Sequence, residues 1–120
     1  MHEIHFYNND LSEMNLEQSM FAGANLSQVN LAQTDLSRAY LSNADLSYTN
    51  LSNADLSYAK ISFSDLSDAN LSCADLRGAI IQEANLSNTN MRGANLTDVN
   101  LEYTNLSKLN LSIVYPYRRK

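Results

Sequence analysis

Residues 44–58 read ADLSY-TNLSN-ADLSY, three five-residue units with one chemical pattern. Each unit contains a small residue, an Asp or Asn, a leucine, a serine and a variable residue. The large position recurs every five residues from Phe6 to Leu111, and all 22 of these sites hold Leu, Ile, Phe or Met. The small position holds only Ala, Thr, Val or Ser at the 17 sites from Ala24 to Thr104. The chain is therefore a tandem repeat with a period of five.

This period excludes an α-helix. A helix turns about 100° per residue, so successive leucines would move about 140° around its axis and form no apolar stripe. In an extended segment residues two apart share a face, so Ala54 and Leu56 point inward while Asp55 points outward. Because five is odd, the last two residues of each unit must form a corner. The final corner position often holds residues that tolerate a positive φ, namely Gly23, Gly78, Gly93, Asn43, Asn53 and Asn88.

The number of units in one coil follows from the polar position. It holds Asp or Asn at 17 of the 21 sites from Asp10 to Asn110. The four exceptions are spaced by twenty residues: Met20, Tyr40, Lys60 and Ile80. Four units per coil would stack residues twenty apart in a column, at the roughly 4.8 Å spacing of neighbouring strands. The sequence therefore predicts an all-β, four-sided parallel β-helix of about five coils.

A chain of 120 residues is the size of one domain. We predict a single β-helical domain over residues 1–120, with repeats at about 4–112 and a C-terminal cap or tail at 113–120. Phe6 and the segment Tyr115-Pro116-Tyr117 are the candidate caps. The predicted structural core includes Leu46, Leu51, Leu56, Ile61, Leu66, Leu71 and Leu76, with Ala54 and Ala74 at small positions.

The repeats from Asn9 to Leu111 resemble the pentapeptide-repeat family, whose pattern is Ala-Asp/Asn-Leu-x-x. The resemblance implies a right-handed quadrilateral β-helix with the large and small residues inside. Family members are functionally diverse. The best-known resemble a rod of DNA and bind type II topoisomerases, which they protect from quinolones or other poisons. Those proteins look longer and pair through terminal helices, and neither feature is visible in this sequence.

No catalytic or metal-binding constellation is visible in the sequence. Cys73 is the only cysteine, and no histidine lies beyond His5 to act as its base. The repeated carboxylates are copies of one site, whereas a general acid and a general base need different environments. His2 and His5 have no nearby third metal ligand. We therefore expect a protein that is not an enzyme and that uses no metal and no cofactor.

Composition indicates the compartment and limits the partners. Residues 1–10 do not form a secretory signal, no apolar run could span a membrane, and one unpaired cysteine fits a reducing compartment. We expect a cytoplasmic, bacterial protein. Residues 10–112 carry 12 acidic and 5 basic residues, a net charge of −7. This acidity supports the alternative of a DNA mimic that binds DNA gyrase or topoisomerase, with about half the charge density of duplex DNA. The only basic cluster is Arg118-Arg119-Lys120, so direct nucleic-acid binding is not expected.

The leading hypothesis is a protein-interaction module. The column of Met20, Tyr40, Lys60 and Ile80, called the third face, would lie near aromatic corner residues, and contiguous apolar patches commonly mark contacts. The full candidate interface is Met20, Tyr40, Tyr58, Lys60, Phe63, Ile80 and Tyr103. Its occupant is an unidentified protein or a second copy of the chain, which the open coil ends could also bind. The alternative is that these residues have no function and arose by random sequence drift, because few constraints act on that surface.

For the face opposite the third face, the sequence predicts a purely structural role. It is an asparagine ladder through Asn30, Asn50, Asn70, Asn90 and Asn110. We expect the stacked amides there to stabilise the coils and not to bind a ligand.

Overall fold

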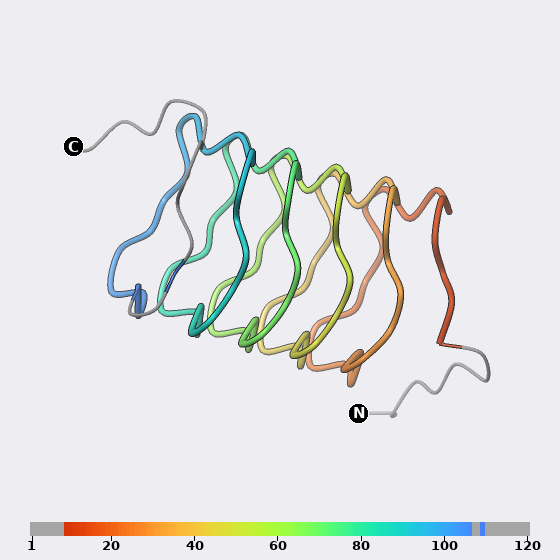
Figure 1. Ribbon diagram of the computed structural model, residues 1–120, viewed down its shortest axis with the longest axis horizontal. Helices are drawn as coiled ribbons and strands as arrows, with labels where there is room; N and C mark the ends of the chain where they lie inside the picture. The colour runs from red at the N-terminus through yellow and green to blue at the C-terminus, as the bar shows by residue number, and fades with distance from the viewer. Residues whose placement is uncertain (1–8, 107–108, 110–120) are drawn as a thin grey trace.

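The computed structural model describes residues 9–106 and residue 109. Its backbone winds into coils that lie side by side along one axis, with the first and last described coils at opposite ends (Figure 1). Within these residues there is no helix, and the β-structure consists of single bridge residues at every fifth position from Asp10 to Asn105. The fold is a β-helix held together by isolated parallel bridges.

Every bridge joins two residues that are twenty positions apart. Asp55, for example, pairs in parallel with Asp35 in the preceding coil and with Asp75 in the following coil. Since each repeat has five residues, four repeats complete one coil. The third face is one of the resulting columns, in which Tyr40 pairs with Met20 and with Lys60. Each side of the coil is so short that only its central residue forms a β-bridge with the neighbouring coils.

The interior contains the large and small positions of the repeat. All nine core residues named from the sequence are at most 1% exposed, including Ala54 and Ala74. Burying one large aliphatic side chain stabilises a fold by about 1.5–3 kcal/mol, so the stacked leucines supply the main driving force. Burial weakens near the first described coil, where Leu11 and Leu16 are partly buried and Met14 is 45% exposed.

Each corner is a tight turn closed by one hydrogen bond. The N–H of the small residue donates to the carbonyl of the large residue three positions earlier, as from Ala54 to Leu51 at 3.1 Å. The last corner residue has a positive φ, which is 59° at Asn53 and 69° at Gly78. A positive φ at the third residue of a hydrogen-bonded turn is the pattern of a type II turn. Glycine and asparagine tolerate it best, but Tyr48, Tyr58, Phe63 and Tyr103 adopt it as well.

Hydrogen bonds between coils use three further N–H groups of each repeat. In the repeat 54–58, Asp55 N donates to a carbonyl of the preceding coil at 2.9 Å. Leu56 N and Tyr58 N donate to carbonyls of the following coil at 2.7 and 2.9 Å. Together with the turn, these bonds give four of the five N–H groups a backbone acceptor. Only the N–H of Ser57 is left for a side chain.

Several residues singled out in the sequence lie outside the described part of the chain. They are His2, His5, Phe6, Asn110, Tyr115, Pro116, Tyr117, Arg118, Arg119 and Lys120.

Candidate protein-interaction surface

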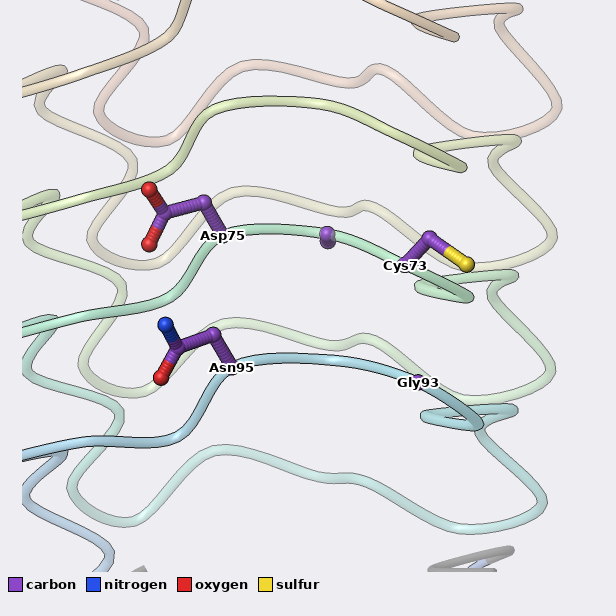
Figure 2. A pocket seen from close by; sticks show the side chains of 5 residues that line it. Cys73, Asp75, Gly93 and Asn95 are labelled. Carbon is purple, nitrogen blue, oxygen red and sulfur yellow. The ribbon is translucent and has the colours of Figure 1, made fainter. Parts of the chain in front are cut away.

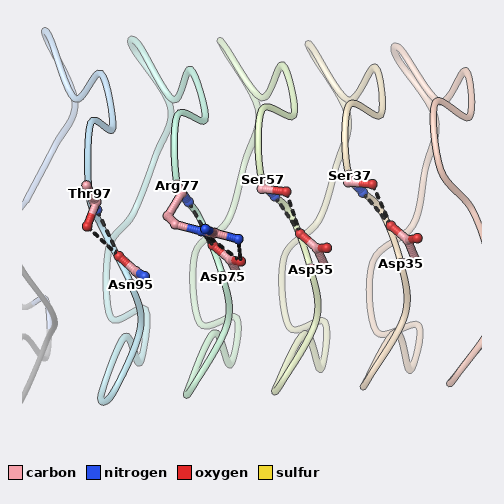
Figure 3. A network of polar contacts seen from close by, with 8 residues as sticks. All are labelled: Asp35, Ser37, Asp55, Ser57, Asp75, Arg77, Asn95 and Thr97. Carbon is pink, nitrogen blue, oxygen red and sulfur yellow. Dashed lines mark hydrogen bonds and ion pairs between the residues drawn. The ribbon is translucent and has the colours of Figure 1, made fainter.

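The Asp and Asn side chains accept the fifth N–H of each repeat. Asp55 Oδ1 accepts the N–H of Ser57 at 3.0 Å and the Ser57 hydroxyl at 2.7 Å. Asn95 Oδ1 accepts the N–H and the hydroxyl of Thr97 in the same way, at 3.1 and 2.7 Å (Figure 3). These local turns through a short side-chain oxygen are called Asx turns. The position therefore requires a side-chain oxygen close enough to accept the N–H two residues later. Asp and Asn both supply this oxygen, which explains why they interchange.

The asparagine ladder stabilises the corners of the coils. Asn30, Asn50, Asn70 and Asn90 each accept the N–H two residues later in their own repeat, at 3.0 Å. The amide oxygens thus stabilise corners within each coil.

The aspartate column Asp35, Asp55 and Asp75 is not a uniform strip of free charge. At Asp75 an arginine replaces the usual serine, and Arg77 donates from Nη2 to Asp75 Oδ2 at 2.7 Å and from Nε to Oδ1 at 2.9 Å. The hydrogen bond from the Arg77 side chain lowers the pKa of Asp75, while Asp75 raises the pKa of Arg77. One of the three carboxylates is therefore neutralised by its own repeat.

The third face lacks the Asx cap in four successive coils. Met20, Tyr40, Lys60 and Ile80 carry neither a carboxylate nor an amide oxygen. In the described part of the chain, the N–H groups two residues later have no protein acceptor; they belong to Ala22, Ser42, Ser62 and Gln82. The cap returns in the next coil, where Asn100 accepts the N–H of Glu102 at 3.0 Å. Since a hydrogen bond contributes about 0.5–1.5 kcal/mol, these four coils forgo measurable stability.

Apolar and aromatic side chains replace the caps on this surface. Met20 is 75% exposed and Tyr40 is 39% exposed. Tyr58 lies on the corner before Lys60 and Phe63 on the corner after it, and both are more than half exposed. Ile80 is 37% exposed, and Tyr103 lies on the following corner two coils beyond Phe63. The fold thus places all seven candidate interface residues on one side or its flanking corners.

Two cations lie over the aromatic rings of this surface. Lys60 Nζ is 4.9 Å from the centre of the Tyr40 ring. The guanidinium carbon of Arg38 is 5.2 Å from the centre of the Tyr58 ring. The repeat pattern does not single out Arg38, so its contact with Tyr58 was not predicted from the sequence. The twenty-residue spacing of the two residues is the signal that could have revealed it.

Tyr58 is held in place from the other neighbouring coil as well. Gly78 lies one coil after it, and a Cβ atom there would approach Tyr58 Cε1 to 2.5 Å. The missing side chain of Gly78 therefore makes room for the tyrosine ring. Tyr58 itself has a φ of 59°, a left-handed conformation that costs about 1–2 kcal/mol for a residue with a Cβ atom. The ring thus contacts Arg38 of the preceding coil and lies beside Gly78 of the following coil.

A shallow depression on another side offers no comparable chemistry. It is lined by Cys73, Ala74, Asp75, Gly93 and Asn95 (Figure 2). The Cys73 thiol is exposed, and Gly93 lies beside it in the next coil. Across residues 9–106 and 109, no three His, Cys, Asp or Glu residues form a metal-binding group. The same residues include no helix of the length and apolarity that a membrane crossing requires.

The stacked coils, buried leucines and repeated Asx turns define a solenoid repeat protein. The family model of pentapeptide repeats matches residues 1–38, 34–72 and 69–107, with 8 copies. The chain belongs to the pentapeptide repeat family. No curated protein sequence matches it closely.

Solved structures of the family have the same fold. A protein of the cyanobacterium Cyanothece 51142 is 34% identical, with a TM-score of 0.54, over 92% of this chain and 93% of its own. A thylakoid lumen protein of Arabidopsis thaliana is 25% identical, with a TM-score of 0.60, over 89% and 70% of the two chains. QnrB1, a plasmid-mediated fluoroquinolone resistance protein, is 20% identical, with a TM-score of 0.68. The match covers 86% of this chain but only 56% of QnrB1.

Restoring one cap should stabilise the protein. In Met20→Asn, the new amide oxygen would accept the N–H of Ala22, and little burial is lost because Met20 is 75% exposed. We expect a gain of about 0.5–1.5 kcal/mol in the free energy of unfolding, measured by urea denaturation. Met20→Ala removes the same side chain without supplying an acceptor and is the control. Equal stability of the two variants would contradict the role given to the cap.

Proposed function

We propose that this protein is a non-enzymatic scaffold, a right-handed quadrilateral β-helix whose third face is a rigid docking surface for another protein. The observation that carries the proposal is the coincidence of two features on one side of the coil, formed by the third face and its flanking corners. The third face forgoes the Asx cap in four coils, and the same coils present Tyr40, Tyr58 and Phe63 to solvent. Drift alone would not be expected to concentrate both features on one side.

The chemistry of the surface supports protein contact. Tyrosine, phenylalanine and methionine are enriched in the buried centres of protein interfaces. Tyr58 is oriented before any partner arrives, which lowers the entropy lost on binding. The biological process is not specified by these features, and a bacterial cytoplasmic location stays a prediction from the sequence.

A triple variant can remove the surface without weakening the coil. In Tyr40→Asn, Tyr58→Asn and Phe63→Asn, asparagine supplies a cap at the first position and tolerates a positive φ at the other two, as at Asn43 and Asn53. We expect the melting temperature to stay at or above that of the parent protein. Capture of partner proteins, or the mass of the self-associated protein in solution, should fall sharply because the aromatic contact area is gone.

The matched control is Tyr48→Asn. Tyr48 is also an exposed tyrosine with a positive φ, but it lies on a corner away from the third face. The control should keep both the captured partners and the solution mass of the parent. If the triple variant also keeps them, the third face is not the interface.

The acidic columns favour a second candidate, a DNA mimic that binds gyrase or topoisomerase. Asp35 and Asp55 repeat at the coil spacing, and residues 10–112 carry a net charge of −7. The Arg77 ion pair at Asp75 weakens the resemblance to a continuous phosphate backbone. The likeness to QnrB1 supports a shared fold alone. A mimic should inhibit gyrase supercoiling or relieve its inhibition by a quinolone, and no effect of excess protein on either would dismiss this candidate.

A further inference from the structure

The few basic residues gather around the third face. Among residues 9–106 and 109, the lysines and arginines are Arg38, Lys60, Arg77 and Arg92, and three of them lie on this face or on the corner before it. The whole chain has a net charge of −5. Positive charge is therefore concentrated on one side of an acidic protein.

Two of these cations are available to a partner. Arg77 is bound to Asp75. Arg38 and Lys60 instead lie over tyrosine rings, and within the described residues neither forms an ion pair with a carboxylate. A cation over an aromatic ring gains about 0.5–1 kcal/mol at an exposed site, which positions it without neutralising its charge. The two cations are pre-positioned beside apolar atoms, where a carboxylate would be partly shielded from water.

Negative charges limit the length of an acidic ligand. Four exposed acidic residues lie on the same two corners, in the first coil and the last two: Glu17, Glu83, Asp98 and Glu102. Arg38 and Lys60 lie in the coils between them. A long polyanion along this side would meet these four acidic residues at both ends, whereas a short segment confined to the two middle coils would avoid them.

The rings themselves also discriminate between ligands. Nucleic-acid bases bind single-stranded readers by stacking on open aromatic faces. At Tyr40 and Tyr58, a cation already lies over one face of the ring. The arrangement suits a carboxylate that pairs with the cation better than it suits a stacked base. A charged membrane surface, like a nucleic acid, would extend over the acidic coils.

We propose that the third face binds a short acidic segment of a partner protein, whose carboxylates pair with Arg38 and Lys60 while its apolar side chains cover Tyr40, Tyr58 and Phe63. This inference rests on the proposed docking function and adds the chemistry of the partner. Charge complementarity of this kind fixes specificity and the association rate, and it weakens as salt screens the charges.

The test uses the full chain and two fluorescein-labelled peptides. One alternates glutamate with phenylalanine and leucine, and the other has lysine at every glutamate position. Fluorescence anisotropy should show binding of the glutamate peptide that weakens with added salt. In the double variant Arg38→Asn and Lys60→Asn, affinity should fall by at least about tenfold because both charge pairs are lost. Asparagine suits both backbone positions, so the variant should remain folded, as circular dichroism would verify.

Arg92→Ser removes an arginine away from the third face, restores the serine usual at its position, and should bind the glutamate peptide like the parent. The proposal is overturned if the glutamate peptide does not bind, if the lysine peptide binds equally well, or if the double variant keeps full affinity. Tighter binding of oligothymidylate, or of phosphatidylcholine vesicles containing phosphatidylserine, would also overturn it. One outcome separates the two proposals: the triple asparagine variant at Tyr40, Tyr58 and Phe63 loses partner capture while the double variant Arg38→Asn and Lys60→Asn keeps it. In that case the docking function stands, and only the inference that the partner segment is acidic is wrong. If both variants keep it, the docking function fails as well.

Discussion

The hydrogen bond from a corner N–H to an Asp or Asn side chain is the constraint on which this structure depends. A five-residue repeat has five N–H groups, and the coil geometry gives backbone acceptors to only four of them. The fifth, such as the N–H of Ser57, is accepted by the side chain two residues earlier. A coil this narrow has no other nearby acceptor except water. The Asp/Asn position is therefore part of the backbone pairing.

Because of this constraint, a position that departs from the Asp/Asn pattern indicates where the protein has another requirement. A residue without an acceptor oxygen at this position weakens its corner, so four such residues in one column indicate a different demand on that side. Tyr58 adds a second distinctive feature, since its ring contacts Arg38 of the preceding coil and occupies the space beside Gly78 of the following coil. Rigid repeats hold these side chains at fixed distances from one coil to the next. Recognition can then be built by substitution, with no change in the backbone.

The periodicity was enough to predict the burial of Leu56 and Ala54 and the column that contains Tyr40 and Lys60, because both follow from counting along the chain. It was not enough to predict side-chain directions at the corners. The contact of Arg38 with Tyr58, and the space that Gly78 leaves, depend on how a residue with positive φ leans toward the next coil. Nor did the periodicity show that the asparagine oxygens stabilise their own corners by accepting the N–H two residues later.

Amide hydrogen exchange of matched serines tests the central claim most directly. Ser47 and Ser42 both follow a leucine at the same point of the repeat, but Ser47 N donates to Asp45 at 3.0 Å whereas Ser42 follows the uncapped Tyr40. A cap worth about 1.4 kcal/mol corresponds to a roughly tenfold difference in exchange, so Ser47 should exchange about ten times more slowly. The same difference should separate Ser67, capped by Asp65, from Ser62. Equal protection of capped and uncapped serines would show that the Asp and Asn oxygens do not protect the fifth N–H of the repeat, and it would contradict the account.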